Sequence, residues 1–386
     1  MQSLDAFARD LLADLDRRTL RRTLSETARQ DEPWVLRDGQ RLLSFCCNDY
    51  LNLSTHPAVI EAALAATRQL GVGAGASRLV TGNHPLYAAL EGRLARLKGT
   101  EDACVFGSGY LANLGIVPVL AGRDDLVLVD ELAHACLWAG ARLTRGRVVL
   151  FRHNDLAHLE ALLAAERAAH PRTLILTDGV FSMDGDLAPL AELGALAQRY
   201  DAWLMSDDAH GIGVLGGGRG SVHVDAVAAP VPLQMGTLSK AVGGYGGYLC
   251  ASRPVIDLIR TRARTFIYST GLPPGTIAAA SAALDVIEAD PDYAAQPVRK
   301  ARLFTQLTGL PEAASPIVPL ILGASEAALE ASRMLAQAGF LVSAIRPPTV
   351  PDGTARLRFT FTAQHPEPEI ARLAQIVKDH IMTGRV

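Results

Sequence analysis

A single lysine in the segment 236–247 is the residue whose chemistry suggests a function. Lys240 lies among glycines and hydroxyl residues, just after an apolar run, 231–235, that is typical of a buried strand. Burial among uncharged groups disfavours the ammonium form, whose pKa is about 10.4 in a free lysine, and leaves an amine that can form a Schiff base. The following glycines let the backbone pass close to a bulky ligand. A solvated lysine in a flexible loop is the alternative that this segment alone leaves open.

Upstream carboxylate and imidazole groups narrow the chemistry. Asp207 and His210 follow the apolar run 203–206 at a spacing of three residues. A buried carboxylate can keep a pyridinium nitrogen protonated, which makes the ring a better electron sink. His210 could bond the ring hydroxyl, and His134 could stack on the ring face. Asp207 as a helix N-cap and the histidines as core residues are the alternatives, and a Schiff-base lysine without Asp207 would equally suit an aldolase.

A phosphate site is predicted where the segment 104–113 turns from a strand into a helix. Free backbone N–H groups and the helix dipole favour an anion at such an N-terminus, here at Gly109 and Tyr110. The hydroxyls of Ser182, Thr237 and Ser239 could assist there.

A second glycine-rich stretch, 71–78, does not match a dinucleotide-binding pattern, because no nearby acidic residue could hold a ribose. We expect it to form a flexible loop over the active site.

These residues need a scaffold, and apolar strand-like segments that alternate with helical ones predict it. Strands are expected at 126–130, 147–151, 173–177, 203–206 and 233–236, and helices at 86–98, 156–169 and 190–199. This alternation indicates an α/β fold with a mostly parallel sheet that helices cover on both faces. Ligands bind at the carboxyl ends of such strands. His134, Ser182, Asp207, His210 and Lys240 all follow predicted strands and should therefore meet at one edge.

The two ends of the chain predict smaller elements. Residues 1–30 are expected to form an amphipathic helix with Arg21 and Arg22 on a basic face, which is either solvated or directed at an anionic substrate. A hairpin is predicted at 34–45, with its turn at Asp38–Gly39. The C-terminal part should contain a helix at 277–288, a strand at 317–322, a helix at 326–338 and strands at 340–345 and 356–361. We expect an N-terminal segment 1–45, a large domain 46–275 and a smaller α+β domain 276–386.

Composition is that of an ordinary soluble enzyme. The 386 residues are 49% hydrophobic and 20% charged, with a net charge of −3, which gives no basic patch for nucleic acid or membrane lipid. No run reaches the roughly 18 apolar residues of a membrane span, and the N-terminus lacks the features of a signal peptide. Five cysteines without Cys-x-x-Cys spacing make a zinc site or a disulfide framework unexpected. A cytoplasmic protein without a metal is the simplest interpretation.

Taken together, the motifs resemble a known family. Asp207-x-x-His210 followed by Thr237-x-x-Lys240 looks like a fold-type I enzyme that uses pyridoxal 5'-phosphate. More narrowly, the chain is similar to the α-oxoamine synthases at Asn48-Asp-Tyr-Leu51, Gly179-Val-Phe-Ser-Met-Asp-Gly-Asp186, Asp207-Asp-Ala-His-Gly211 and Tyr268-Ser-Thr270. The similarity runs from about residue 20 to the C-terminus.

The resemblance implies roles for individual residues. Lys240 would carry the cofactor as a Schiff base, Asp207 would pair with the pyridine nitrogen, His210 would bond the ring hydroxyl, and His134 would stack on the ring and lie near the substrate. The resemblance implies that the cofactor is surrounded by Gly109, Tyr110, His134, Ser182, Asp207, His210, Thr237 and Lys240.

The resemblance also implies the substrates. Arg346, helped by Asn48, would grip an amino-acid carboxylate, while Thr349 and either Arg21 or Arg22 would lie near an acyl substrate. The segment 344–358 is most similar to members that condense L-alanine with pimeloyl-CoA or pimeloyl-acyl carrier protein in biotin synthesis. Members that use glycine or serine with another acyl-CoA are the alternative, followed by an aminotransferase of the same fold and by a non-enzymatic binding protein. The family implies a homodimer with sites at the subunit interface.

Overall fold

The computed structural model describes residues 2–18 and 20–382. Its backbone contacts group the chain into two compact units. The larger unit is Cys47–Val318 with Thr360–Val386, and the smaller unit is Met1–Cys46 with Pro319–Phe359. This grouping places residues 276–318 with the larger unit, whereas the sequence-based division places them with the C-terminal domain. That division into domains stays a prediction.

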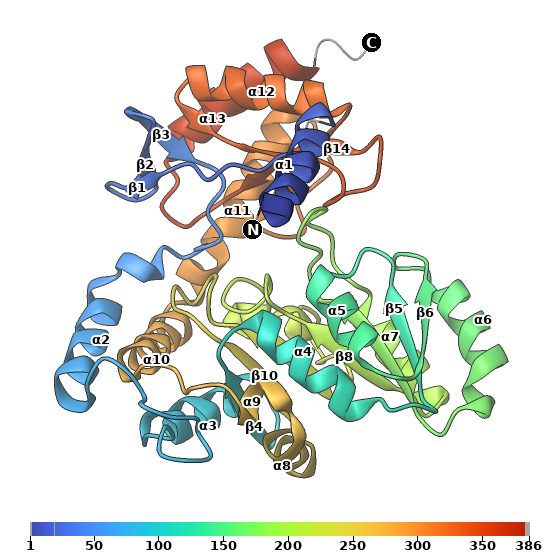
Figure 1. Cartoon of the computed structure of the whole chain (residues 1–386). Coiled ribbons are helices and arrows are strands. Elements are labelled where there is room, and N and C mark those ends of the chain that lie inside the picture. Colours follow the sequence, from blue (N-terminus) through green and yellow to red (C-terminus); the bar gives the residue numbers. More distant parts are fainter. Residues whose placement is uncertain (1, 19, 383–386) are drawn as a thin grey trace. The chain divides into compact units, whose positions relative to one another are not determined.

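A seven-stranded sheet forms the centre of the larger unit (Figure 1). Its strand order is β4-β10-β9-β8-β7-β5-β6, and only β10 runs antiparallel to its neighbours. The predicted mostly parallel sheet is therefore confirmed, although β10 was not expected. The strands are β4 (Asp102–Phe106), β5 (Leu126–Asp130), β6 (Arg147–Phe151), β7 (Thr173–Asp178), β8 (Trp203–Asp207), β9 (Leu233–Thr237) and β10 (Gly247–Ala251).

Helices cover both faces of this sheet because its central strands are apolar on both sides. In β5, Val127 and Val129 pack with α4, α5, α8 and α9, while Leu126 and Leu128 pack in a second cluster with α6 and α7. A third cluster joins α2, α3 and α10. These helices are α2 (Pro57–Leu70), α3 (Leu86–Lys98), α4 (Gly109–Leu120), α5 (Ala135–Leu143), α6 (Leu156–Glu166), α7 (Leu190–Arg199), α8 (Arg253–Arg262), α9 (Arg264–Ile267) and α10 (Pro274–Ala289).

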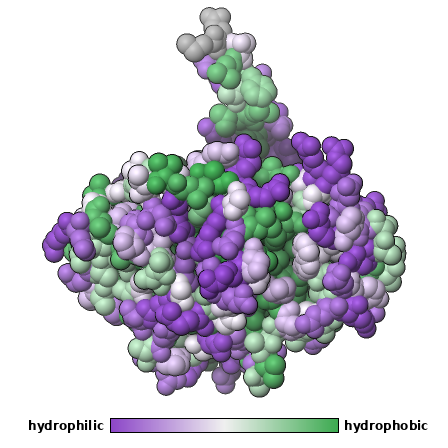
Figure 2. All heavy atoms as spheres, turned by 90° about the horizontal axis from the view of Figure 1, so that it is seen from below, coloured by the Kyte–Doolittle hydropathy of each residue, from purple (hydrophilic) through white to green (hydrophobic). Residues whose placement is uncertain are grey.

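The larger unit also holds α11 (Pro291–Thr308) and α13 (Glu367–Val377), which the sequence analysis did not predict, as it did not predict α2, α5, α8 and α9. Single helical turns lie at Leu53–Thr55, Arg167–Ala169, Gly216–Gly218, Ser221–His223 and Lys378–Met382. No helix in the described ranges is long and apolar enough to cross a membrane. The face shown in Figure 2 carries hydrophobic residues in patches among hydrophilic ones.

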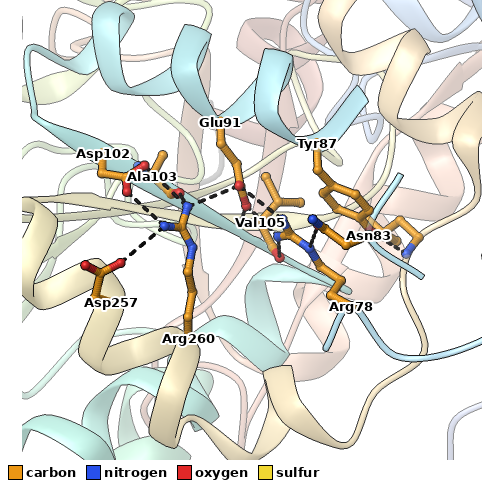
Figure 3. A network of polar contacts seen from close by, with 10 residues as sticks. Arg78, Asn83, Tyr87, Glu91, Asp102, Ala103, Val105, Asp257 and Arg260 are labelled. Atoms are coloured by element: carbon orange, nitrogen blue, oxygen red, sulfur yellow. Dashed lines mark hydrogen bonds and ion pairs between the residues drawn. The ribbon is translucent and has the colours of Figure 1, made fainter. Parts of the chain in front are cut away.

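A buried ionic network ties the glycine-rich stretch 71–78 to the sheet (Figure 3). Arg78, at its end, makes a two-pronged ion pair with Glu91 of α3 and lies 3.7 Å over the ring of Tyr87. Glu91 also accepts the backbone N–H of Val105 in β4 at 2.8 Å and a bond from Arg260 of α8 at 3.2 Å. The stretch is a loop, as predicted; that it covers an active site stays a prediction.

The smaller unit contains the predicted hairpin, which is formed by β2 (Trp34–Arg37) and β3 (Gln40–Ser44). Asp38 and Gly39 form its turn, with φ angles of 50° and 75°. The remaining elements are α1 (Gln2–Arg17), β1 (Thr27–Arg29), α12 (Ser325–Gln337), β12 (Phe340–Leu341) and β13 (Ser343–Ile345), with β11 (Ile317–Gly323) and β14 (Ala355–Thr360) shared at the unit boundary.

Two predictions for the smaller unit are wrong in detail. The N-terminal helix ends at Arg17 rather than near residue 30, because the following Thr23, Ser25 and Thr27 favour extended chain over helix. The single strand expected at 340–345 is two strands: β12 pairs with β3, whereas β13 pairs with β14.

Candidate active site

Lys240 and His210 are brought together by two neighbouring parallel strands. Lys240 follows β9 and His210 follows β8, and the lysine Nζ lies 2.7 Å from His210 Nε2. Lys240 is half-buried and His210 is buried. An amine in hydrogen-bond contact with an imidazole at this sheet edge is placed for proton transfer to and from a bound molecule.

The other nitrogen of His210 is held by a residue to which the sequence analysis gave no role. The hydroxyl of Tyr50, a fully buried side chain, lies 2.6 Å from His210 Nδ1 and 3.4 Å from Asn48 Oδ1. Asn48 is therefore linked to Lys240 through Tyr50 and His210. Tyr50 lies within the quoted segment Asn48–Leu51, so the motif was visible even though the contact was not.

Asp207 ends β8 as a buried carboxylate with several partners. Its Oδ2 accepts a hydrogen bond from Asn113 Nδ2 at 2.8 Å and lies 3.8 Å from the Cys136 thiol, while its Oδ1 accepts from the N–H of Ala209 at 3.0 Å. Asn113 and Cys136 were not predicted. The Oδ1 of Asn113 is buried and has no hydrogen-bond partner in the described chain.

His134 caps the start of α5 beside the same carboxylate. Its Nδ1 accepts the N–H of Cys136 at 3.3 Å, and its own N–H donates to Asp178 Oδ2 at 2.7 Å. Desolvation by the surrounding atoms lowers the pKa of His134, and the positive charge of Lys240 lowers it further. The negative charge of Asp207 acts in the opposite direction and raises it, and part of the residue is exposed to solvent. Burial, aided by Asp207, raises the pKa of Asp178 well above its usual range.

The predicted phosphate site has the geometry of an open helix N-terminus. Ser108 caps α4 by accepting the N–H of Leu111 at 3.2 Å, and the N–H groups of Gly109 and Tyr110 have no acceptor within the helix. A Cβ on Gly109 would lie 3.3 Å from Met235 Cε and 3.4 Å from the Cβ of Thr237, so the start of α4 packs closely against β9. The Thr237 hydroxyl donates to the carbonyl of Gly246 at 2.7 Å.

Ser182 lies in the loop after β7, where it is half-buried. This loop is closed by a bridge between Val180 and Leu187 and by the bond from the Ser315 hydroxyl to the carbonyl of Gly185 at 2.7 Å. Whether Ser182 reaches the cofactor stays a prediction.

The remaining predicted residues meet in the smaller unit, around a cleft of about 410 Å³. Arg22 Nη2 donates to Thr349 Oγ1 at 3.2 Å, whereas Arg21 is paired with Asp16 at 2.7 Å. The side chains around the cleft include Arg21, Arg22, Arg346 and Thr349. A different cavity of about 1110 Å³ opens at the other ends of the strands, near Trp203 and Leu233, and is lined by none of the predicted site residues.

Comparison with known proteins identifies the class. The model of the aminotransferase class I and II family matches residues 40–377. The chain therefore belongs to this family and, within it, to the α-oxoamine synthases of fold-type I, as the motifs predicted.

Individual relatives and solved structures show which members of the family the chain is similar to. The chain is 64% identical over 378 residues to the 8-amino-7-oxononanoate synthase of Granulibacter bethesdensis and 63% identical over 377 residues to that of Beijerinckia indica, in each case covering 98% of both chains. Among solved structures it is similar to the Sphingomonas wittichii serine palmitoyltransferase, with a TM-score of 0.89, 30% identity and coverage of 97% and 96% of the two chains. A serine palmitoyltransferase variant with PLP gives a TM-score of 0.90 at 28% identity, covering 98% and 97%.

The donors at the sheet edge fit pyridoxal 5'-phosphate. Lys240 offers an amine for the aldehyde, and Asp207 is a buried carboxylate suited to a ring nitrogen. The N–H groups of Gly109 and Tyr110, which have no acceptor within α4, lie at the helix N-terminus close to Thr237, a combination that suits a phosphate.

Proposed function

We propose that this protein is an 8-amino-7-oxononanoate synthase, an acyltransferase of biotin synthesis that uses pyridoxal 5'-phosphate. It condenses L-alanine with a pimeloyl thioester of CoA or of an acyl carrier protein, and it releases carbon dioxide and the free thiol. The observation that carries the proposal is the Lys240–His210 contact beside Asp207, in a chain 64% identical over nearly its full length to a synthase of that name.

The residues at the sheet edge would hold the cofactor. Lys240 would bond its aldehyde carbon, Asp207 would keep a proton on the ring nitrogen, and His134 would pack on the ring face. The N-terminus of α4 would hold the phosphate, together with Gly109, Tyr110, Thr237 and Ser182. When bound, the cofactor supplies a ring that accepts the electron pair released from the Cα–H bond of alanine.

The protein's own groups then move one proton. Arg346, assisted by Asn48, would grip the carboxylate of alanine and so orient its Cα–H bond for proton removal. The Lys240 amine would remove that proton, and the contact at 2.7 Å from His210 would steady the amine in its two protonation states. The Cα would then attack the thioester carbon, the thiolate would leave and take a proton from water, the original carboxylate would depart as carbon dioxide, and Cα would regain a proton from Lys240.

The cleft in the smaller unit would receive the acyl chain. A pimeloyl group ends in a carboxylate, which the guanidinium groups of Arg21 and Arg22 suit. The bond from Arg22 to Thr349 favours Arg22 as the arginine that binds the acyl substrate together with Thr349. Arg21 pairs with Asp16 and would make a weaker contact with the substrate.

We further propose a cytoplasmic homodimer. Support for the dimer comes from large apolar side chains exposed in the larger unit: Val72 (82%), Leu79 (58%), Val80 (73%), Tyr110 (52%) and Tyr268 (73%). A bridge between Ser77 and Thr270 brings two of these segments together. Exposed apolar side chains on two paired segments are typical of an interaction surface.

Thiol release tests the proposed reaction. Purified protein mixed with L-alanine and pimeloyl-CoA should release free thiol and form a product with the mass of 8-amino-7-oxononanoate, and glycine or serine in place of alanine should give much less. Faster thiol release with glycine and a short acyl-CoA would point to another α-oxoamine synthase. Transfer of the amino group to an oxo acid, without thiol release, would point to an aminotransferase.

A further inference from the structure

His153 lies between two carboxylates at the same sheet edge as Lys240, and the proposed reaction does not use it. Its Nδ1 lies 3.1 Å from Asp130 Oδ1 and its Nε2 lies 2.8 Å from Asp186 Oδ2. The imidazole packs edge-on against Phe181, with ring centroids 4.3 Å apart and planes at 88°. Only 20% of its side chain is exposed. Each nitrogen of this ring therefore has its own carboxylate.

The first carboxylate shapes the turn that carries His134. Asp130 ends β5, and its Oδ1 accepts the N–H of Leu132 at 2.9 Å while its backbone carbonyl accepts the N–H of Ala133 at 3.1 Å. The next residue is His134, at the start of α5. A displacement of the Asp130 carboxylate would therefore move the turn that sets the direction of the His134 ring.

The second carboxylate closes the loop that carries Ser182. The backbone carbonyl of Asp186 accepts the N–H of Phe181 at 3.0 Å, and Gly185 donates back to Phe181 at 2.8 Å. Asn154, the neighbour of His153, donates from Nδ2 to Asp186 Oδ2 at 3.1 Å and from its backbone N–H to Asp130 Oδ2 at 3.0 Å. His153 and Asn154 therefore both bond the turn after Asp130, which carries His134, and the loop 179–186, which carries Ser182.

Only the protonated ring can serve both carboxylates. A neutral imidazole has one N–H donor and turns a lone pair toward the other carboxylate, whereas the imidazolium donates from both nitrogens. Although burial opposes the charge, the bonds to Asp130 and Asp186 raise the pKa of His153 to about 10. The nearby Glu131 accepts the backbone N–H of His153 at 2.8 Å and adds a further negative charge.

We propose that His153 is a positioning residue that fastens the His134 turn to the Ser182 loop and so fixes two cofactor-facing side chains with one cation. This proposal rests on the proposed function, because it takes His134 and Ser182 as contacts of pyridoxal 5'-phosphate. A hydrogen bond to a charged group is stronger than a neutral one, so losing it should loosen both loops and weaken cofactor binding by roughly tenfold.

Two variants test the proposal in the holoenzyme. His153→Gln keeps a single amide donor without the charge, and Asp186→Asn keeps the shape of the acceptor without its charge. Both should lose pyridoxal phosphate roughly tenfold faster on dialysis and should change the circular dichroism of the cofactor band, which reports the ring's surroundings. His170→Ala is the matched control, because His170 bonds the Asp124 carbonyl at 2.8 Å and pairs with Glu166 beyond the opposite end of the strands.

The possible results separate the two proposals. A wild-type protein that binds no pyridoxal phosphate would reject both. Wild-type binding with unchanged retention and unchanged dichroism in both variants would reject the role of His153 alone, even if both melt at lower temperature, since a purely structural contact moves only the melting temperature. Faster cofactor loss in His170→Ala of the same size would equally reject it.

Discussion

At the scale of single residues, Lys240 carries the chemistry, because its amine is both the anchor and the base of the proposed reaction. Lys240→Ala should reduce thiol release to background and should abolish borohydride-stable labelling by the cofactor. Lys378→Ala removes an exposed lysine of the same protein and should leave both unchanged. Substantial turnover by Lys240→Ala without added amine would contradict the assignment.

Tyr50 is expected to tune that amine through His210. Tyr50→Phe removes the hydroxyl that lies 2.6 Å from His210 Nδ1 but keeps the buried ring, so the fold should persist. We expect kcat to fall roughly tenfold with an altered pH profile, because His210 loses a hydrogen bond in a buried site. Tyr293→Phe, which loses a bond to the Leu51 carbonyl at 2.6 Å, should leave the pH profile unchanged. An unshifted profile in Tyr50→Phe would remove this role.

The positions of the proposed reactive residues were easier to predict from the sequence than those of the residues that contact them. Asp207, His210 and Lys240 could be found because the first two lie together at the end of one apolar strand and the lysine lies at the end of the next. Asn113 and Asp178 could not, since the asparagine lies within a helix and Asp178 has no histidine three residues on that would mark it as Asp207 is marked. Their importance arises only where the strands β5, β7 and β8 place distant segments side by side.

At the scale of elements, the loops at the sheet edge depend on charge. The pKa of His153 is raised from 6.5 to about 10 in the folded protein, so its stabilising contribution is complete below the unfolded pKa and is lost as the pH rises through the folded one. The urea midpoint of the wild type should therefore exceed that of His153→Gln most at mildly acidic pH, and the difference should shrink steadily toward about pH 10. Unfolding followed by circular dichroism measures this, and a difference that grows with pH would contradict it.

Glu91 should matter more to stability than an exposed carboxylate. Its side chain is 6% exposed and joins Arg78, Arg260 and the N–H of Val105. Glu91→Gln removes the carboxylate shared by the nearly buried Arg78 and the partly exposed Arg260, which keeps its pair with Asp102, and should lower the free energy of unfolding by about 3 kcal/mol. Glu160→Gln breaks an exposed pair with Arg199 and should cost less than about 1 kcal/mol. If urea unfolding gave the same decrease in the free energy of unfolding for Glu91→Gln and Glu160→Gln, burial of the ion pair would not explain its contribution to stability.

Element boundaries followed the sequence where periodicity was strong. The helix Leu190–Arg199 and the strand Leu126–Asp130 begin and end where predicted, because apolar spacing and burial agree there. The N-terminal helix was drawn too long, since basic residues after Arg17 continue the charge pattern but lack apolar partners. The split of 340–345 between two sheets depends on pairing with β3 and β14, which lie far away in sequence.

At the scale of the whole molecule, the alternation of strands and helices sufficed for the α/β class. It could not reveal that β10 returns antiparallel between β4 and β9, since five apolar residues read alike in either direction. Nor could it show which surface would receive a second copy in the proposed dimer, because surface apolar residues lack a periodic signature. The exposed side chains near Val80 and Tyr268 are the proposed surface.

The proposed dimer assigns these exposed residues to an interface, which the mass of the protein in solution can test. Val80 is 73% exposed in the single chain and lies in the loop joined to Thr270 through Ser77. Val80→Asp should shift the mass measured by light scattering from two chains toward one, because burying an unpaired carboxylate in an interface is costly. Val227→Asp, at a valine that is 80% exposed in another segment, should leave the mass unchanged. A wild type with the mass of one chain would contradict the proposed dimer, and a Val80→Asp variant that keeps the mass of two chains would show that Val80 lies outside the interface.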